Sequence, residues 1–290
     1  MKKHAVCILA HKNWKQLDDL IETLGCGYAD VFLHIDKKHR IDFDTYAEGH
    51  DFKRHTNVCM IESRNVDWGG GHSQLLVELE LFKEVLKRSE RYSYVHLISG
   101  QDFPLMPMSQ IVKECDATGA DYLGFITGSN KKRYVRRLRY WNILVSKVRE
   151  SKVCAYTRKA FLALQMLIGV DRLKHCPLTF EVGANWMSIT IESLIFIVDE
   201  YPKYEKYFKH GISAEECYKQ MILKTCPVAH IVNSSKRYVV FENMNPSPKT
   251  LTMDMLDQIM ASGAFFARKF DDDVDKNVRL EIMERIIQNI

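Results

Sequence analysis

Several features that mark other protein classes are missing from this chain of 290 residues. No stretch reaches the roughly 18 consecutive apolar residues that a membrane-spanning helix needs. The eight cysteines form no Cys-x-x-Cys pair, which argues against a zinc ribbon or a thioredoxin-type redox site. The net charge of +4 is too small to indicate a nucleic-acid-binding protein. With 46% hydrophobic residues, the chain can instead bury the core of one large globular domain.

The amino terminus has two lysines before an apolar run, an arrangement that superficially suggests a signal peptide. The run extends only from Ala5 to Ala10, which is shorter than the apolar region of a typical signal peptide. We therefore expect a first core strand here. Cysteines such as Cys7 and Cys59 lie inside apolar stretches, where a thiol behaves as a small hydrophobe. The expected location is the cytoplasm, with free thiols, and peripheral contact with the inner face of the cell membrane stays open.

Strand and helix patterns alternate through the first half of the chain. Apolar runs predict strands over residues 4–10, 30–35, 58–61, 92–98 and 122–126, and helical spacing predicts helices over residues 14–24 and 73–87. Strands that alternate with helices build a mainly parallel sheet with helices on both faces. The predicted fold class is therefore α/β, with a mainly parallel central sheet flanked by helices.

The second half of the chain is less regular. Its patterns predict helices over residues 160–168, 189–200, 214–223, 251–260 and 274–287, and strands over residues 228–232 and 237–241. The helix over 189–200 is expected to end before Pro202, because proline interrupts the helical hydrogen bonds. No internal repeat, low-complexity tract or clear linker is present, so we expect a single domain over residues 1–290.

Polar or glycine-rich segments follow four of the predicted strands. They are His11-Lys12-Asn13, His34-Ile35-Asp36-Lys37, Trp68-Gly69-Gly70-Gly71 and Ser99-Gly100-Gln101-Asp102, the last closed by Pro104 as a turn. In a parallel sheet these segments emerge along one rim, which is where ligands bind in open α/β sheets. An ordinary transition from strand to loop would use the same residue types.

The glycines at positions 69–71 allow close approach of a ligand to the backbone, and the next helix offers unpaired N–H groups to an anionic or hydroxylated ligand. The chain has no G-x-x-x-x-G-K-[ST] motif, and no G-x-G-x-x-G follows its first strand. The rim thus lacks the usual nucleotide fingerprints but suits a nucleotide-linked substrate.

Five segments in order resemble the core-2/I-branching enzymes, glycosyltransferases of family 14 that also include the proteoglycan xylosyltransferases. The segments lie at residues 10–13, 34–38, 66–70, 96–105 and 266–270, and the last reads Phe-Ala-Arg-Lys-Phe. The resemblance implies a GT-A-like fold, a UDP-sugar donor, inversion at the anomeric carbon, and no essential metal or other cofactor. Members usually carry a membrane anchor and disulfides, neither of which is evident here. The chain therefore resembles a bacterial-type member, with a nucleotide-sugar half over about residues 1–126 and an acceptor half over about residues 127–290.

The resemblance places the catalytic base at Glu216, with Glu215 as the adjacent alternative. An inverting transfer needs a carboxylate to take the proton of the attacking hydroxyl. Ser213 followed by two carboxylates is equally typical of a capped helix start, so a purely structural role also stays open.

For the donor, the resemblance and the rim together predict contacts from His11, Asp36, Trp68, Gly69, Gln101, Asp102, Lys249, Arg268 and Lys269. Asp36 is the expected uridine contact. The segment that carries an Asp-x-Asp metal motif in many GT-A enzymes has no paired carboxylates here, and Asp42-Phe43-Asp44 fits a surface turn. Lys249 and Lys269, assisted by Arg268, align with the family's diphosphate-binding basic residues, which replace a metal.

For the acceptor, the resemblance indicates Arg136, Arg139, Trp141 and Trp186, with the tryptophans stacking on a sugar face or packing in the core. The first two belong to a basic cluster over residues 131–139. Three roles of this cluster stay open: contact with an anionic lipid surface, contact with the pyrophosphate of a lipid-linked acceptor, or plain solvation.

The predicted function is an inverting, metal-independent transfer of a sugar from a UDP-sugar to a hydroxyl of a glycan or lipid-linked glycan, forming a β-linkage. Family analogy favours GlcNAc as the sugar. A catalytically inactive carbohydrate- or nucleotide-sugar-binding relative is the alternative. A nucleic-acid-binding module is disfavoured, because the basic cluster lacks interleaved aromatics.

Overall fold

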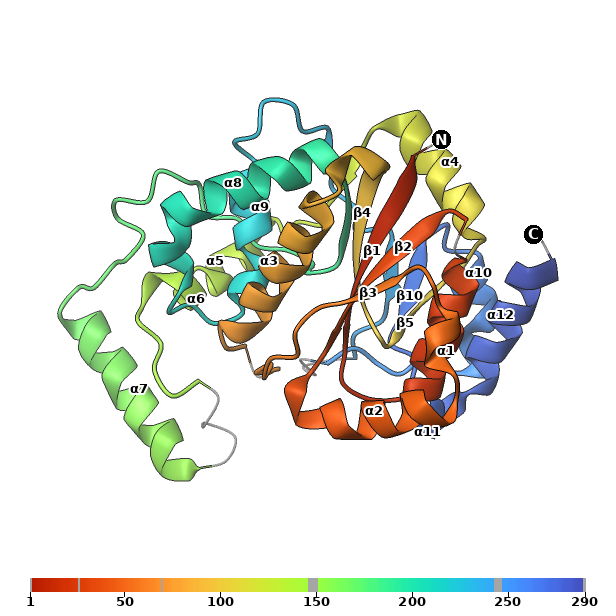
Figure 1. The fold of residues 1–290 in the computed structure, drawn as a ribbon. Coiled ribbons are helices and arrows are strands. Elements are labelled where there is room, and N and C mark those ends of the chain that lie inside the picture. The colour runs from red at the N-terminus through yellow and green to blue at the C-terminus, as the bar shows by residue number, and fades with distance from the viewer. Residues whose placement is uncertain (1, 26, 69, 146–150, 243–246, 289–290) are drawn as a thin grey trace.

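The computed structural model describes residues 2–25, 27–68, 70–145, 151–242 and 247–288 (Figure 1). Its centre is a seven-stranded sheet with the order β3-β2-β1-β4-β7-β6-β8. The strands are β1 Lys3–Ala10, β2 Ala29–Ile35, β3 Val58–Met60, β4 Tyr92–Ser99, β6 Asp121–Tyr122, β7 Met187–Thr190 and β8 Ile231–Val232. Only β7 pairs antiparallel with its neighbours β4 and β6, and the other pairings are parallel. The predicted α/β class with a mainly parallel sheet is confirmed.

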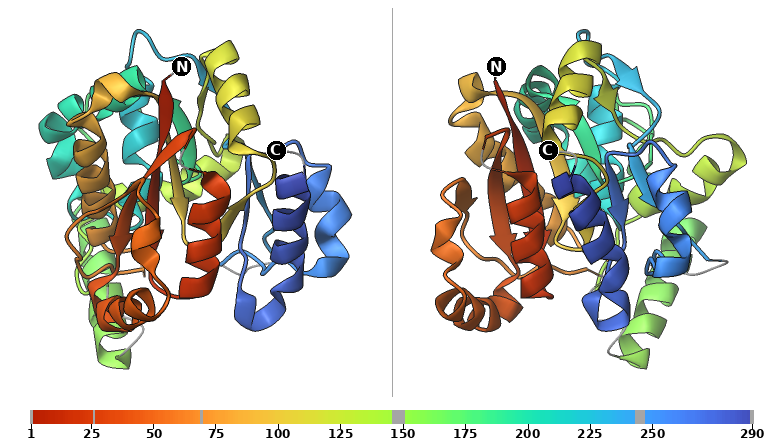
Figure 2. Two further views of the ribbon diagram at one scale, coloured as in Figure 1. Left: turned by 45° about the vertical axis from the view of Figure 1, so that its right-hand side comes forward. Right: turned by 90° about the vertical axis from the view of Figure 1, so that its right-hand side faces the viewer.

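Helices cover both faces of this sheet, as the two views of Figure 2 show. They are α1 Trp14–Leu24, α2 Arg40–Gly49, α3 Ser73–Leu86, α4 Met108–Thr118, α5 Gly128–Tyr134, α6 Arg136–Arg139, α7 Lys152–Leu167, α8 Ile191–Phe208, α9 Tyr218–Leu223, α10 Leu256–Met260, α11 Asp272–Asp275 and α12 Asn277–Gln288. Because strand side chains alternate between faces, β1 contributes to two cores. Val6 and Ile8 pack with α1, α4 and α12, whereas Cys7 and Leu9 pack with α3, α8 and α9.

A second, three-stranded sheet follows β4 and consists of β5 Asp102–Pro104, β10 Phe266–Arg268 and β9 Arg237–Val239. The expected turn at Gln101 therefore continues into a strand that the sequence did not predict. In the antiparallel pairing of β5 and β10, Arg268 is the register partner of Asp102. This sheet brings the carboxyl-terminal basic residues to the end of β4.

Several predicted elements of the second half have other bounds in the structure. The predicted helix over 189–200 was wrong at both ends: Ile189 belongs to β7, and α8 continues through Pro202 to Phe208. Burial of Tyr207 and Phe208 keeps α8 helical beyond the proline, because this packing outweighs the lost hydrogen bond. Strand β6 is shorter than predicted, α7 begins at Lys152, and α4 was not predicted.

The Asp42-Phe43-Asp44 segment lies in α2 and not in a surface turn, so that prediction was wrong. Phe43 is buried between α1 and α2, and its ring contacts the Trp14 ring with centroids 5.4 Å apart. This apolar contact holds the segment in a helix, whereas Asp44 forms an ion pair with Arg40 at 2.8 Å. The seven described cysteines are all free, as expected.

Candidate functional site at the carboxyl rim of the sheet

The ends of β1 and β2 bring His11, Asp36 and Trp68 together. The Asp36 backbone N–H donates to the carbonyl of Ala10 at 2.9 Å, and its carboxylate accepts a hydrogen bond of 2.8 Å from the Trp68 indole N–H. The ring centroid of Trp68 is 4.6 Å from that of His11. Burial, followed by the nearby His39 and Lys12 side chains, lowers the pKa of His11 to about 4, so the His11 imidazole is neutral at neutral pH.

The Asp36 carboxylate is fully buried and also accepts backbone N–H groups of Lys38 and Val66 at 3.2 and 3.4 Å. It therefore fixes the position of Trp68, whose partly exposed ring lies beside His11. The predicted contact of Asp36 with uridine stays a prediction. Gly69 lies outside the described residues.

The end of β4 forms a second group of predicted donor residues. The Asp102 carboxylate is buried and accepts hydrogen bonds of 3.0 Å from both the backbone N–H and the hydroxyl of Ser99. It lies 3.5 Å from the Arg268 guanidinium, which stacks over the Trp186 ring at 4.4 Å. The structure thus places Trp186, predicted for the acceptor, beside a residue predicted for the donor. The Gln101 side chain donates to the Phe270 carbonyl at 3.2 Å.

Arg268 carries two buried N–H positions, at Nε and Nη1, that have no hydrogen-bond partner among the described residues. Burial lowers the pKa of this guanidinium and of neighbouring Lys269, and for Lys269 the charges of Lys12 and Arg268 act in the same direction. Lys12 forms an ion pair of 2.6 Å with Asp271. An anion at this place would supply the missing acceptors and relieve the repulsion among the three cations.

Lys249 is less clearly part of this group. Its exposed ammonium lies 3.2 Å from the Glu242 carboxylate. The connection to Lys269 runs through the backbone, where the Leu251 N–H donates to the Lys269 carbonyl at 2.9 Å. Among the described residues, no contact joins the Lys249 side chain to Arg268 or Lys269.

Glu216 ends a 3-10 turn, Ala214–Glu216, that contacts the loop after β3. The Ser213 N–H donates to the Gly70 carbonyl at 2.9 Å, and both residues have positive φ, 48° and 96°. A Cβ at Gly70 would lie 3.0 Å from the Ser213 hydroxyl, so glycine permits this close approach. Ser213 is the N-cap residue of this turn and both carboxylates lie in its first turn, but the Ser213 side chain makes no capping hydrogen bond.

The carboxylate of Glu216 is partly exposed and forms an ion pair with Arg137 of α6. Arg137 also stacks on the Tyr134 ring at 4.4 Å. The Glu216 carbonyl accepts the Gly183 N–H at 2.9 Å, which fixes the backbone beneath the carboxylate. Glu216 is therefore held at an accessible position where its oxygens face a cation.

The neighbouring carboxyl group of Glu215 has a different environment. It is buried, and its Oε2 has no hydrogen-bond partner among the residues that the structure describes. Burial, followed by the charges of Glu216 and Glu78, raises the pKa of Glu215 to about 8. Lys219 lies below it and donates to the Glu215 carbonyl at 2.8 Å and to the Glu78 carboxylate at 2.6 Å. A mainly protonated Glu215 is a poorer base at neutral pH than an ionised carboxylate.

The four residues predicted for the acceptor do not form one cluster. Arg136 is exposed on α6, and Arg139 forms an ion pair with Asp171 at 3.2 Å. The exposed Trp141 contacts the His210 ring at 4.9 Å between centroids and stacks under the Arg172 guanidinium at 4.4 Å. In the described part of the chain, Arg137 is the residue of the basic cluster that contacts Glu216.

His4, His96 and Cys115 are the metal-type ligands that the described residues gather most closely, with ligand atoms within 4.8 Å of one another. His4 begins β1, so it lies about 20 Å from the rim at a strand rise of about 3.3 Å per residue. A hydrogen bond of 2.8 Å joins the two imidazoles, and His96 continues to the Ser188 hydroxyl at 2.7 Å. Burial lowers the pKa of both histidines, as expected for a neutral hydrogen-bonded chain inside the sheet.

The buried ion pair of Glu78 and Lys219, which lies next to Glu215, was not predicted from the sequence. Glu78 lies on α3 between Leu75 and Phe82, at the spacing of the apolar face. A carboxylate at such a position predicts a buried cationic partner, and this signal was available from the sequence. The identity of the partner, Lys219, was not, because the two residues are 141 positions apart.

The fold is that of an α/β protein, and the polar segments that follow β1, β2 and β4 are its candidate ligand site. Residues 28–261 match the family model "Branch: Core-2/I-Branching enzyme". The chain therefore belongs to the core-2/I-branching enzyme family, a family of glycosyltransferases. Its α/β fold with a mainly parallel sheet agrees with the predicted class. The predicted motifs at residues 10–13 and 266–270 lie outside the matched region.

No curated protein matches the chain. Among solved structures, it is similar to 4-diphosphocytidyl-2C-methyl-D-erythritol synthase from Anaerococcus prevotii. The two are 11% identical, with a TM-score of 0.41 over 90% of this chain and 96% of the other. A likeness of this degree supports no argument about function.

Proposed function

We propose that this glycosyltransferase moves a sugar from a UDP-sugar to a hydroxyl of a glycan or lipid-linked glycan, with inversion and without a metal ion. GlcNAc is the sugar that the family favours. The observation that carries the proposal is the group of three cations at the rim, Arg268, Lys269 and Lys12, which suits the binding of an anion. Among the described residues, Nε and Nη1 of Arg268 make no hydrogen bond, although Nε lies 3.5 Å from the Asp102 carboxylate. These N–H groups suit the oxygens of a diphosphate.

In the proposed reaction, the Glu216 carboxylate accepts the proton of the acceptor hydroxyl. The hydroxyl oxygen forms a bond to the anomeric carbon as the bond from that carbon to the UDP oxygen breaks, and UDP leaves with the electron pair. Fixed cations stabilise the charge that develops on the leaving diphosphate. The ion pair with Arg137 orients the Glu216 carboxylate before the acceptor binds.

Metal independence is supported by the charges at the rim. The carboxylates there already have partners: Asp102 is engaged by Ser99 and Arg268, Asp36 by Trp68, and Asp271 by Lys12. The cations are already part of the protein. A metal ion would have to compete with these cations for the same phosphate oxygens.

The test is UDP release by the purified protein with UDP-GlcNAc, UDP-xylose and UDP-glucose and a panel of glycan acceptors. We expect release with one donor, undiminished by excess chelator. Activity that chelator abolishes and manganese restores would overturn metal independence. Donor binding without release on any acceptor would favour the inactive, sugar-binding relative.

A further inference from the structure

Helix α7 (Lys152–Leu167) packs only weakly against the rest of the molecule. It projects from the body on the side of α5 and α6 (Figure 1). Of its 16 residues, only Gln165 is buried. The Gln165 side chain accepts from the Trp141 N–H at 2.8 Å and donates to the Trp141 carbonyl at 3.0 Å. The helix is thus attached through Gln165, and Cys154, Phe161 and Leu162 are among its partly buried apolar residues.

The outward face of α7 is apolar. Val153, Tyr156 and Leu167 are 73%, 70% and 84% exposed, and Leu164 is exposed beside them. At about 100° per residue, these side chains fall within one arc of roughly 80°. An ordinary surface helix turns its polar residues outward and its apolar stripe toward the core. Here large apolar side chains also occupy the outward arc, which indicates that another apolar medium covers this face.

The charges on α7 favour an anionic lipid surface as that medium. No Asp or Glu occurs between residues 152 and 167, whereas Lys152, Arg158 and Lys159 are present. Both lysines are exposed and lie along one edge of the apolar arc. Basic residues that flank an exposed apolar face are typical of helices that lie in a membrane interface.

Neighbouring helices add to this positive surface. Lys132 and Arg133 of α5 and Arg136 of α6 are exposed, and Figure 1 shows both helices on the same side of the molecule as α7. Among the described residues, no helix is long and apolar enough to cross a membrane. Contact with lipid would therefore be made in the plane of the interface.

We propose that α7 docks on an anionic lipid bilayer, with Val153, Tyr156, Leu164 and Leu167 at the boundary between headgroups and acyl chains. The helix would lie about 5–10 Å deep, while Lys152 and Lys159 contact the phosphates. This proposal concerns binding alone and does not depend on the proposed transfer reaction.

The test is co-sedimentation of the full chain with vesicles of phosphatidylcholine alone or of phosphatidylcholine mixed with phosphatidylglycerol. We expect binding to the mixed vesicles and weaker binding as salt increases. The double variant Leu164→Gln/Leu167→Gln should bind about tenfold more weakly or worse, because it removes much of the apolar contact. Lys152→Gln/Lys159→Gln should also bind about tenfold more weakly and lose most of the salt dependence.

The matched control is Ile41→Gln, which removes an 81% exposed apolar side chain from α2 instead of α7. It should bind vesicles like the unmodified protein, and circular dichroism should show all variants to be folded. Absence of binding to anionic vesicles, or equal binding by the α7 variants and the control, would overturn the proposal. So would a dimer in light scattering that the Leu164 and Leu167 changes convert to a monomer, because a second copy would then cover α7.

Discussion

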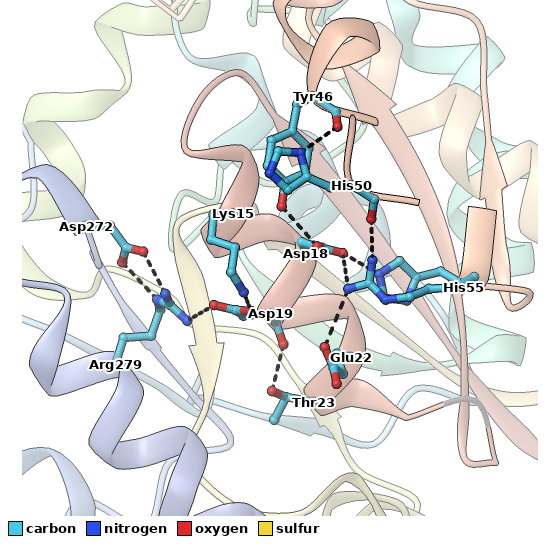
Figure 3. Close-up of polar contacts among 11 residues, drawn as sticks. Lys15, Asp18, Asp19, Glu22, Thr23, Tyr46, His50, His55, Asp272 and Arg279 are labelled. Carbon is cyan, nitrogen blue, oxygen red and sulfur yellow. Dashed lines mark hydrogen bonds and ion pairs between the residues drawn. The ribbon is translucent and has the colours of Figure 1, made fainter. Parts of the chain in front are cut away.

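Each face of the central sheet buries one cluster of charged side chains, and the two clusters differ in how their carboxyl groups are satisfied. On the α1 face, Asp18 accepts hydrogen bonds from Tyr46 and His55 at 3.0 and 2.5 Å (Figure 3). It also accepts one from Arg54 at 2.9 Å. Burial alone would raise the pKa of Asp18, but these donors outweigh burial and the pKa is lowered. This carboxylate stays ionised because its oxygens have several partners.

Asp19, next to Asp18, extends the same cluster to the carboxyl terminus. Arg279 of α12 lies 3.0 Å from Asp19 and makes two hydrogen bonds with Asp272, at 2.8 and 2.6 Å (Figure 3). Lys15 also pairs with Asp19. The network attaches α12 beside α1 and is remote from the Glu216 carboxylate, so we assign it a structural role.

On the α3 face, one ammonium group serves two acidic residues. Lys219 donates to Glu78 and to the backbone of Glu215, while the Glu215 carboxyl is left without enough donors and its pKa is raised to about 8. The comparison shows that burial alone does not decide the charge of a carboxyl group: the number of donors does. The less satisfied carboxyl group, that of Glu215, belongs to the residue next to the candidate base.

The largest effect is expected from Glu216→Gln, which keeps the size of the side chain but removes its ability to accept a proton. Turnover should fall by about 10²–10⁴, with UDP-sugar binding nearly unchanged in calorimetry. Glu215→Gln is the matched control and should remain active. If only Glu215→Gln is inactive, the base is Glu215; if both variants are active, it lies elsewhere.

The next effect concerns stability. Lys219→Met leaves the buried Glu78 carboxylate without its cation and should lower the free energy of unfolding by roughly 3–5 kcal/mol in urea titrations. Arg279→Met, on the other face, should cost less, roughly 1–3 kcal/mol, because Asp19 keeps Lys15 and Asp272 is partly exposed to water. A larger loss for Arg279→Met would contradict our ranking of the two clusters.

A smaller effect is expected at the rim. Lys269→Ala should weaken UDP-sugar binding by roughly tenfold to a hundredfold, as expected for the loss of a charge-assisted contact. Lys249→Ala should have less effect, because its ammonium already pairs with Glu242. Titration calorimetry measures both. Equal losses would show that Lys249 leaves Glu242 to contact the donor.

The smallest effects are expected in the pH dependence of the free energy of unfolding, first at Glu215. Folded Glu215 keeps its proton up to about pH 8, whereas unfolded Glu215 releases it near its ordinary, lower pKa. Folding therefore takes up a proton between these values, and this contribution to stability falls as pH rises through that window. Glu215→Gln should flatten the fall in urea titrations between about pH 5 and pH 9.

The contribution of Asp18 to the pH dependence of stability has the opposite sign. Its lowered pKa in the folded state adds stability above the ordinary pKa of Asp, and this stability is lost as pH falls through the folded value. Asp18→Asn should flatten the acidic side of the curve and leave the side near pH 8 unchanged. If both variants change the same side of the curve of stability against pH, our interpretation of the two clusters is wrong.

Much of the carboxyl rim of the sheet could be predicted from the sequence because its parts are local. Each parallel strand is recognised in the sequence as an apolar run. A polar segment that directly follows a strand must lie at the carboxyl end of that strand. His11, Asp36 and Trp68 were expected together on this basis and are in contact. The prediction failed where packing over long separations decides the structure, as with α8 beyond Pro202 and the small sheet that places Arg268 opposite Asp102.

By itself, the sequence determined the fold class, the order of the rim segments and the family, because periodicity and short motifs depend on residues close in the chain. Only the tertiary structure decided which charges meet. Burial and pairing depend on neighbours that are distant in sequence. Arg137 pairs with Glu216, which is 79 positions away, and Lys219 pairs with Glu78, which is 141 positions away. It also decided that the apolar stripe of α7 faces outward, because the pattern of a helix does not state which side the protein covers.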